Sequence, residues 1–178
     1  MSRSLHILSL FEVIKGKSML TVGQLRNYAS QIDKKQGEPR PVSVLGTNPI
    51  LQNKTLTIRA EARGTKIYPL VVTFYNVDYS LEKDSNHPLV VRPKFGEPFF
   101  MQSASEGSNP VQVRCACPFF KFAWAHWDKQ EKALSGAPFP TYVRKTKTRP
   151  EINPGHLPGV CKHLIGLFDR LRRDKILQ

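Results

Sequence analysis

The chain has 178 residues, 40% of them hydrophobic, and its 27 Lys and Arg against 14 Asp and Glu give a formal net charge of +13 at pH 7. That length suits one compact domain, or one domain with an arm, and the apolar fraction is enough for a folded core. No apolar run reaches the roughly 18 residues that a membrane-spanning helix needs, so we expect none. The basic excess predicts an acidic partner, which can be nucleic acid, an anionic membrane or an acidic protein surface.

Residues 1–40 are predicted to form an N-terminal helical arm. The first helix covers residues 4–15 with Ser4 as its cap, and its amphipathic pattern fits a helix better than a signal peptide. The second helix begins at Thr21, where Thr21-Val-Gly-Gln24 has the spacing of a capping box. The apolar stripes consist of Leu8, Phe11 and Ile14, and of Leu25, Tyr28 and Ile32. These stripes favour packing on a sheet or on a neighbouring chain over membrane binding.

Residues 41–110 are predicted to form an antiparallel β region, because the apolar pattern changes to a period of two at Lys54. Polar residues there alternate with Leu56, Ile58, Ala60 and Ala62. A tight turn at 63–66 then leads to a strand at 70–79, whose β-branched and aromatic residues predict a central place in the sheet. The remaining predicted strands are 89–92, 98–103 and the one that delivers Cys115.

Four residues form a candidate metal site: Cys115 and Cys117, then Cys161 and His163, which together use every cysteine of the chain. Three thiolates and one imidazole complete a tetrahedral set for a structural Zn²⁺, with no coordination position left for a substrate. Two alternatives are buried free thiols and a disulfide. A bridge between Cys115 and Cys117 is awkward, because strand neighbours at i and i+2 lie about 7 Å apart. The odd cysteine count and the lack of a predicted signal peptide favour a reducing compartment at synthesis.

The residues around these pairs predict a strand before the first pair and a helix after the second. Val111 and Val113 alternate with polar residues up to Cys115, and Pro118 stops the strand. After His163, apolar residues recur at helical spacing and the stretch ends in basic residues. The C-x-C … C-x-H pattern resembles the SWIM-type zinc finger, in which C-x-C ends a strand and C-x-H opens a helix.

The predicted elements together give an α+β fold, in which an antiparallel sheet carries two N-terminal helices, and the resemblance adds a C-terminal SWIM-like ββα zinc module at 111–178. Its insert, 118–160, puts 43 residues between the two ligand pairs, which is longer than the usual SWIM spacing. SWIM fingers are associated with binding of both DNA and protein.

The insert combines aromatic and basic residues. Its aromatic residues are Phe119, Phe120, Phe122, Trp124 and Trp127. They can stack on single-stranded nucleic acid, but we favour packing around the metal site. The basic run consists of Arg144, Lys145, Lys147 and Arg149, which belong either to a solvated loop or to one that contacts an anion or another subunit. His126 and His156 lack metal spacing to another candidate and are interpreted as surface or polar-network residues.

A longer stretch, from about Tyr75 to Leu167, is similar to a zinc-knuckle protein type found in large tailed bacteriophages. The similarity rests on Val113-Arg-Cys-Ala-Cys-Pro-Phe-Phe120, Pro140-Thr-Tyr-Val-Arg-Lys-Thr146 and Asn153-Pro-Gly-His-Leu-Pro-Gly-Val-Cys-Lys-His163. It implies a virion or assembly protein that is made late in infection and has no known reaction. We therefore expect a place in the virion after synthesis in the host cytoplasm, with a cytoplasmic protein as the alternative.

No nucleophile elbow, phosphate-binding glycine loop or H-E-x-x-H motif occurs, and no carboxylate pair stands out. We therefore expect a non-enzymatic zinc-binding structural protein of a phage head, neck or tail, with no small-molecule substrate. The alternative is a SWIM-type nucleic-acid-binding protein. In that case the basic run and the C-terminal helix would contact phosphate, the helix through Arg170, Arg172 and Arg173.

Overall fold

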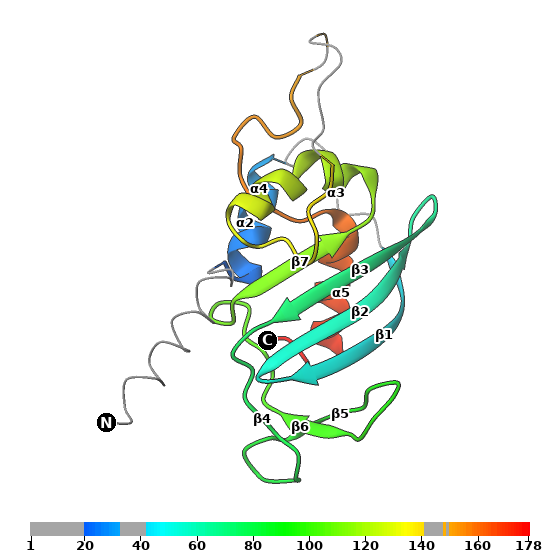
Figure 1. Ribbon diagram of the computed structural model, residues 1–178, viewed down its shortest axis with the longest axis vertical. Coiled ribbons are helices and arrows are strands. Elements are labelled where there is room, and N and C mark those ends of the chain that lie inside the picture. The colour runs from blue at the N-terminus through cyan, green and yellow to red at the C-terminus, as the bar shows by residue number, and fades with distance from the viewer. Residues whose placement is uncertain (1–19, 33–41, 141–147, 149) are drawn as a thin grey trace, which may run out of the picture.

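The computed structural model describes residues 20–32, 42–140, 148 and 150–178 (Figure 1). The predicted helix at 4–15 lies outside the described residues. So does the basic run Arg144, Lys145, Lys147 and Arg149. None of the described helices is both long and apolar enough to span a membrane.

A four-stranded antiparallel sheet forms the centre of the molecule, and its strands are β1 (Ser43–Gln52), β2 (Thr55–Arg63), β3 (Ile67–Phe74) and β7 (Val111–Cys115). The order is β1-β2-β3-β7, so the predicted central position of the third strand is confirmed. The turn between β2 and β3 was also predicted, and in it the Gly64 N–H donates to the Lys66 carbonyl at 2.8 Å.

Strand β1 is absent from the sequence prediction because two residues interrupt its pattern. Gly46 has φ +56°, and the register with β2 shifts there by one residue, which makes a β-bulge. Pro49 has no N–H to donate, which suits an edge strand. Both residues read as turn signals in the sequence, yet here they protect an exposed edge from pairing with another strand.

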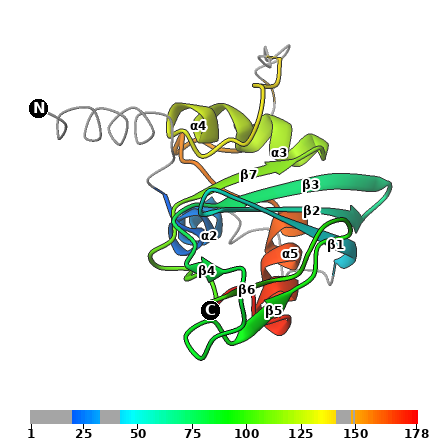
Figure 2. The same cartoon turned by 60° about the horizontal axis from the view of Figure 1, so that its bottom comes forward.

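Two helices contribute to the core beneath this sheet. Helix α5 (Lys162–Arg173) lies behind the sheet in Figure 1 and below it in Figure 2, and its apolar stripe of Leu164, Leu167, Phe168 and Leu171 is buried. Helix α2 (Val22–Ile32) confirms the second predicted helix. Its capping box is formed, because the Thr21 N–H donates to Gln24 Oε1 at 2.9 Å and the Gln24 N–H donates to Thr21 Oγ1 at 3.4 Å.

The short strands form a second antiparallel sheet, whereas the sequence predicts a single one. Its strands are β4 (Tyr79–Ser80), β5 (Leu89–Val91) and β6 (Phe99–Met101), in the order β4-β6-β5. The predicted strand at 70–79 is broken because Asn76 adopts a left-handed conformation with φ 57°. The Asn109 side chain fixes this break by donating to the carbonyl groups of Tyr75 and Asn76.

Hydrogen bonds join the predicted β region, 41–110, to the predicted zinc module, 111–178. Strand β7 pairs with β3 over Leu70–Phe74, and the C-terminal segment pairs with residues 104–106. In that second contact, the Ala104 N–H donates to the Ile176 carbonyl and the Gln178 N–H to the Ala104 carbonyl, both at 2.8 Å. Their buried apolar side chains belong to one hydrophobic core.

Candidate metal centre

The four predicted ligands lie at the ends of three elements. Cys115 is the last residue of β7, and Cys117 is the N-cap of α3 (Pro118–Ala123). Cys161 is the N-cap of α5, and His163 lies in the first turn of that helix. Each ligand pair therefore lies at a transition from extended to helical backbone. The two transitions are close together in space.

The four side chains are buried, and their donor atoms all lie within 4.8 Å of one another. Nδ1 of His163 is 3.9 Å from Sγ of Cys115 and 3.9 Å from Sγ of Cys161. In a tetrahedral zinc site an S···N edge measures about 3.6 Å, given bond lengths of about 2.3 and 2.0 Å. The three cysteines are free thiols, so the disulfide alternative does not hold. The cluster could thus hold a metal ion such as zinc, and thiolate with imidazole is the donor set that Zn²⁺ prefers.

Hydrogen bonds within the cluster favour a thiolate at Cys117. Bonds from Cys115 and then from Cys161 lower the pKa of the Cys117 thiol, whereas the bond with Cys117 raises the pKa of Cys115 to about 12. The backbone N–H of Phe120 also donates to Cys117 Sγ, at 3.3 Å. Burial is the main cause that raises the pKa of Cys161. A dication would replace the protons of Cys115 and Cys161 and compensate the negative charge of the three thiolates that result.

The β2–β3 hairpin closes over the imidazole of His163. A Cβ atom placed on Gly64 would lie 2.8 Å from His163 Nε2, so only glycine fits there without displacing the ring. The Tyr68 ring packs on the imidazole with 5.0 Å between centroids, and its hydroxyl is 3.0 Å from Thr65 Oγ1. Nothing in the sequence links this hairpin to the site, because about 100 residues separate Gly64 from His163.

The insert begins with two short helices, α3 and α4 (Ala125–Gln130). Phe120 and Trp124 are fully buried next to the cysteine pair, which supports core packing for these aromatic residues. Phe122, in contrast, is 50% exposed. A Cβ on Gly159 would lie 2.7 Å from Cε3 of Trp124, so the returning chain passes directly against the indole ring.

Two buried polar residues hold the returning chain in place, and sequence reasoning missed both. Asp128 accepts a hydrogen bond from the Gly159 N–H at 2.8 Å, and burial raises its pKa well above the usual range for a carboxyl group. Asn153 donates to the Ala123 carbonyl at 2.8 Å and to the Leu157 carbonyl at 2.7 Å. Asp and Asn are usually surface residues, so no local signal marks these two as buried.

The two histidines of the insert, His126 and His156, lie outside the cluster. His126 is exposed and 3.1 Å from Gln130 Nε2. His156 stacks on Trp127 at 4.3 Å and lies 3.3 Å from Glu151. Among the described residues, the metal cluster includes neither of them.

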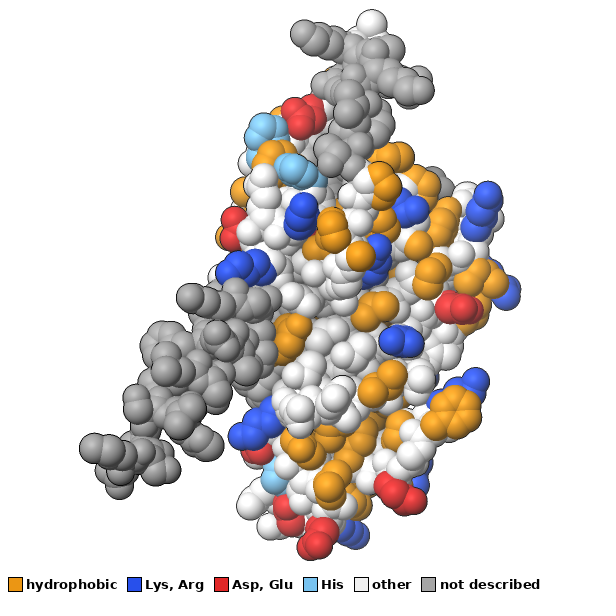
Figure 3. Space-filling view, in the orientation of Figure 1, with side chains coloured by type: hydrophobic (Ala, Val, Ile, Leu, Met, Phe, Trp, Pro, Cys, Tyr) orange, Lys and Arg blue, Asp and Glu red, His pale blue; other side chains and the backbone are white. Residues whose placement is uncertain are grey.

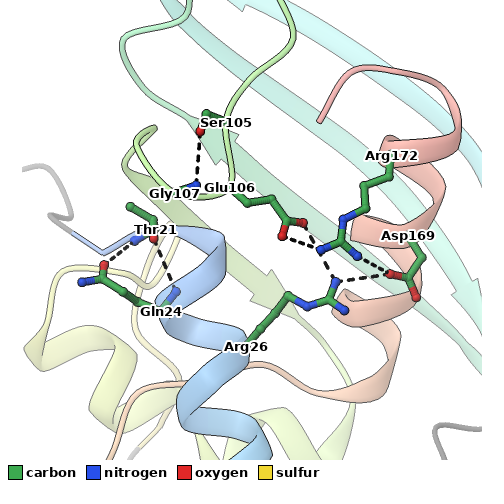
Figure 4. A network of polar contacts seen from close by, with 8 residues as sticks. All are labelled: Thr21, Gln24, Arg26, Ser105, Glu106, Gly107, Asp169 and Arg172. Carbon is green, nitrogen blue, oxygen red and sulfur yellow. Dashed lines mark hydrogen bonds and ion pairs between the residues drawn. The ribbon is translucent and has the colours of Figure 1, made fainter. Parts of the chain in front are cut away.

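The predicted anion-binding residues of the C-terminal helix are largely engaged within the chain. Arg170 pairs with Asp174 at 2.8 Å, and Arg172 pairs with Asp169 at 3.1 Å and with Glu106. Arg26 of α2 reaches the same two carboxylates, so this network joins α2, the 105–107 loop and α5 (Figure 4). Arg173 is exposed and makes no ion pair with any residue that the structure describes.

No protein-family model matches the chain, and no curated protein or solved structure is significantly similar to it. The geometry of the cluster is therefore the basis for its interpretation as a metal centre.

The substitution Gly64→Ala should weaken metal binding, because the new methyl group would push His163 away from the three sulfur atoms. Partners outside the ligand set typically change metal affinity by about tenfold or more. Competition with a chromophoric zinc chelator measures the change. Gly107→Ala is the matched control, since its Cβ would meet no atom closer than 3.9 Å. Equal zinc affinities for the two variants would contradict the proposed role of the hairpin.

The substitution Asp128→Asn should stabilise the protein more at pH 8 than at pH 5. A carboxyl group whose pKa is raised in the folded state stabilises below its unfolded pKa of about 3.9, and this contribution is lost as the pH rises towards the folded value. Asparagine still accepts a hydrogen bond from Gly159 and cannot ionise. Urea denaturation at both pH values measures the difference, with the exposed Glu131→Gln as control. A stability difference that is independent of pH would disprove the buried neutral carboxyl.

Proposed function

We propose that this chain is a non-enzymatic structural protein whose C-terminal half is held together by a zinc ion bound to Cys115, Cys117, Cys161 and His163. The observation that supports this is the buried cluster of four donor atoms within 4.8 Å of one another. Zinc in such a site supplies no reaction but ties its ligands together, because four protein ligands leave no coordination position for a substrate. The four ligand residues lie at the end of β7, the start of α3 and the start of α5, so binding them to one ion would hold these three points together.

The finer assignment is to a SWIM-like module with a long insert. Its support is the order of the elements, since the C-x-C pair ends a strand and the C-x-H pair opens a helix. The 43-residue insert departs from the usual SWIM spacing, and here it adds α3 and α4 and two buried aromatic residues beside the cluster. We interpret the insert as an enlargement of the small core that zinc modules otherwise have.

We further propose that the protein is a virion component of a large tailed bacteriophage that docks onto neighbouring virion or assembly subunits. The support is the resemblance of residues 113–120, 140–146 and 153–163 to a phage zinc-knuckle type. The protein would be made in the host cytoplasm and carried into the particle.

Nucleic-acid binding is the second candidate function, and the formal charge of +13 favours it. Arg170 and Arg172 are held in ion pairs, and the basic run at 144–149 lies outside the described residues. Arg173 of the same helix is exposed, and other exposed basic residues of the described surface are further candidates for a nucleic-acid contact.

Replacing one ligand by Cys161→Ser should abolish zinc binding and unfold the C-terminal module. Metal-binding free energy is folding free energy in such modules, on the order of 10 kcal/mol at neutral pH. Zinc content and the near-UV circular dichroism spectrum report the loss, and Cys161→His, which can still bind the metal, should retain part of both. If the Ser variant melts like the wild type with a native near-UV spectrum, the cysteines are only buried thiols.

The virion assignment predicts that peptides of this chain occur in purified particles of the phage that encodes it, at a fixed ratio to the major capsid protein. Quantitative mass spectrometry before and after a density gradient measures this ratio. A chain that stays with the soluble lysate proteins and is absent from the particle band is no virion component.

A further inference from the structure

One face of the four-stranded sheet, here called the outer face, points away from α5. Ile58, Val72 and Val113 are neighbours in register and are buried, so they define the inner face. Successive side chains of a strand alternate between faces, which places Arg59, Val71 and Arg114 in one row on the outer face. No described helix lies over β1, β2 or β3 on this side (Figure 1).

The outer face carries arginine side chains whose charge is not neutralised. Arg59 and Arg63, both on β2, are exposed and make no ion pair with a described residue. Arg114 lies 3.9 Å over the ring of Phe139 and donates to the carbonyl groups of Ser135 and Ala137, which are uncharged acceptors. Among the described outward-facing strand residues, Glu61 is the one carboxylate. Lys and Arg side chains are spread over this view of the molecule (Figure 3).

The arginines of α2 and α5, in contrast, are paired with carboxylates. Arg26, Arg170 and Arg172 are each within ion-pair distance of Asp or Glu, so their charge serves the fold. Arg59 and Arg63 have no comparable structural role. Exposed guanidinium groups without a carboxylate partner are the usual donors to phosphate oxygens.

We propose that the outer face of the sheet binds the phosphate backbone of double-stranded nucleic acid, with Arg59, Arg63 and Arg114 as phosphate contacts. Two strand spacings separate Arg59 from Arg114, about 10 Å, and four residues along β2 separate Arg59 from Arg63, about 14 Å. These separations are close to the width of the major groove, about 12 Å, so the side chains can reach phosphates on both of its sides. The inference rests on the second candidate function, nucleic-acid binding.

The composition of the face favours a phosphate backbone over bases and over a protein partner. No aromatic residue faces outward on the four strands, and the ring of Phe139 beside them is already covered by Arg114. Base stacking therefore has no open platform on the strands, and we expect binding that is independent of sequence. The exposed large apolar residues of the face, Ile50 and Ile67, lie opposite Thr57 and Arg63, about 20 Å apart along β2. Strand addition at the β1 edge is opposed by the bulge and by Pro49.

The test measures binding of the full chain to a fluorescent 30-base-pair DNA duplex by anisotropy, from about 50 to 200 mM salt. The double variant Arg59→Gln/Arg63→Gln should lower the slope of log K against log salt by about 2, since each phosphate contact contributes about 0.9. Glu61→Gln should strengthen binding. The control variant Arg92→Gln/Arg173→Gln also removes two positive charges, one directly after β5 and one in α5. Its salt slope should stay close to that of the wild-type chain. Zinc content and melting curves of all variants confirm that the fold is kept.

Each other outcome overturns a defined part of the proposal. If the two double variants lose affinity equally, nucleic-acid binding stands but the outer face is not its site. If the wild-type chain fails to bind the duplex at low salt, the second candidate function fails with it. If it binds poly-glutamate instead, and that binding needs Arg59 and Arg63, the face recognises an acidic polypeptide and the nucleic-acid proposal is wrong.

Discussion

The meeting of two short ligand pairs at one buried point is the constraint on which the rest of the structure depends. The end of β7 brings Cys115 and Cys117, and the start of α5 brings Cys161 and His163. Because 43 residues lie between the pairs, the chain must leave the site and return to it over a long path. Because the ligands are buried, neighbouring segments must pack closely against them. At the points of closest approach only small residues fit, as at Gly64 and Gly159.

The surroundings of the cluster meet that requirement by steric and polar contacts that differ on its two sides. On one side Gly64 and Tyr68 confine the imidazole of His163, so its Nδ1 faces the sulfur atoms. On the other side Gly159 passes against Trp124, and Asp128 fixes the backbone of Gly159 two residues before Cys161. These contacts hold the ligands in place from outside the ligand set, as partners of metal ligands commonly do.

The features that could be predicted from the sequence are those with a local pattern. Strand β2 shows a period of two, α2 begins with a capping box, and α5 has an apolar stripe, so all three were predicted near their observed bounds. The ligand set followed from spacing. Strand β1 was missed because Gly46 and Pro49 resemble turn residues, and the roles of Gly64 and Asp128 were missed because they arise only from contacts between distant segments.

The distribution of charge separates residues that build the fold from those available to a partner. The ion pairs of Arg26 and Arg172 join α2 and α5, whereas Arg59 and Arg63 stand on the outer face of the sheet. Ten of the 27 Lys and Arg, but only three of the 14 Asp and Glu, belong to residues 1–19, 33–41, 141–147 and 149, outside the described part. X-ray absorption at the zinc edge of the purified protein tests the central claim most directly. A shell of three sulfur atoms at about 2.3 Å and one nitrogen at about 2.0 Å is expected, and a shell with fewer sulfur atoms, or no zinc at all, would contradict it.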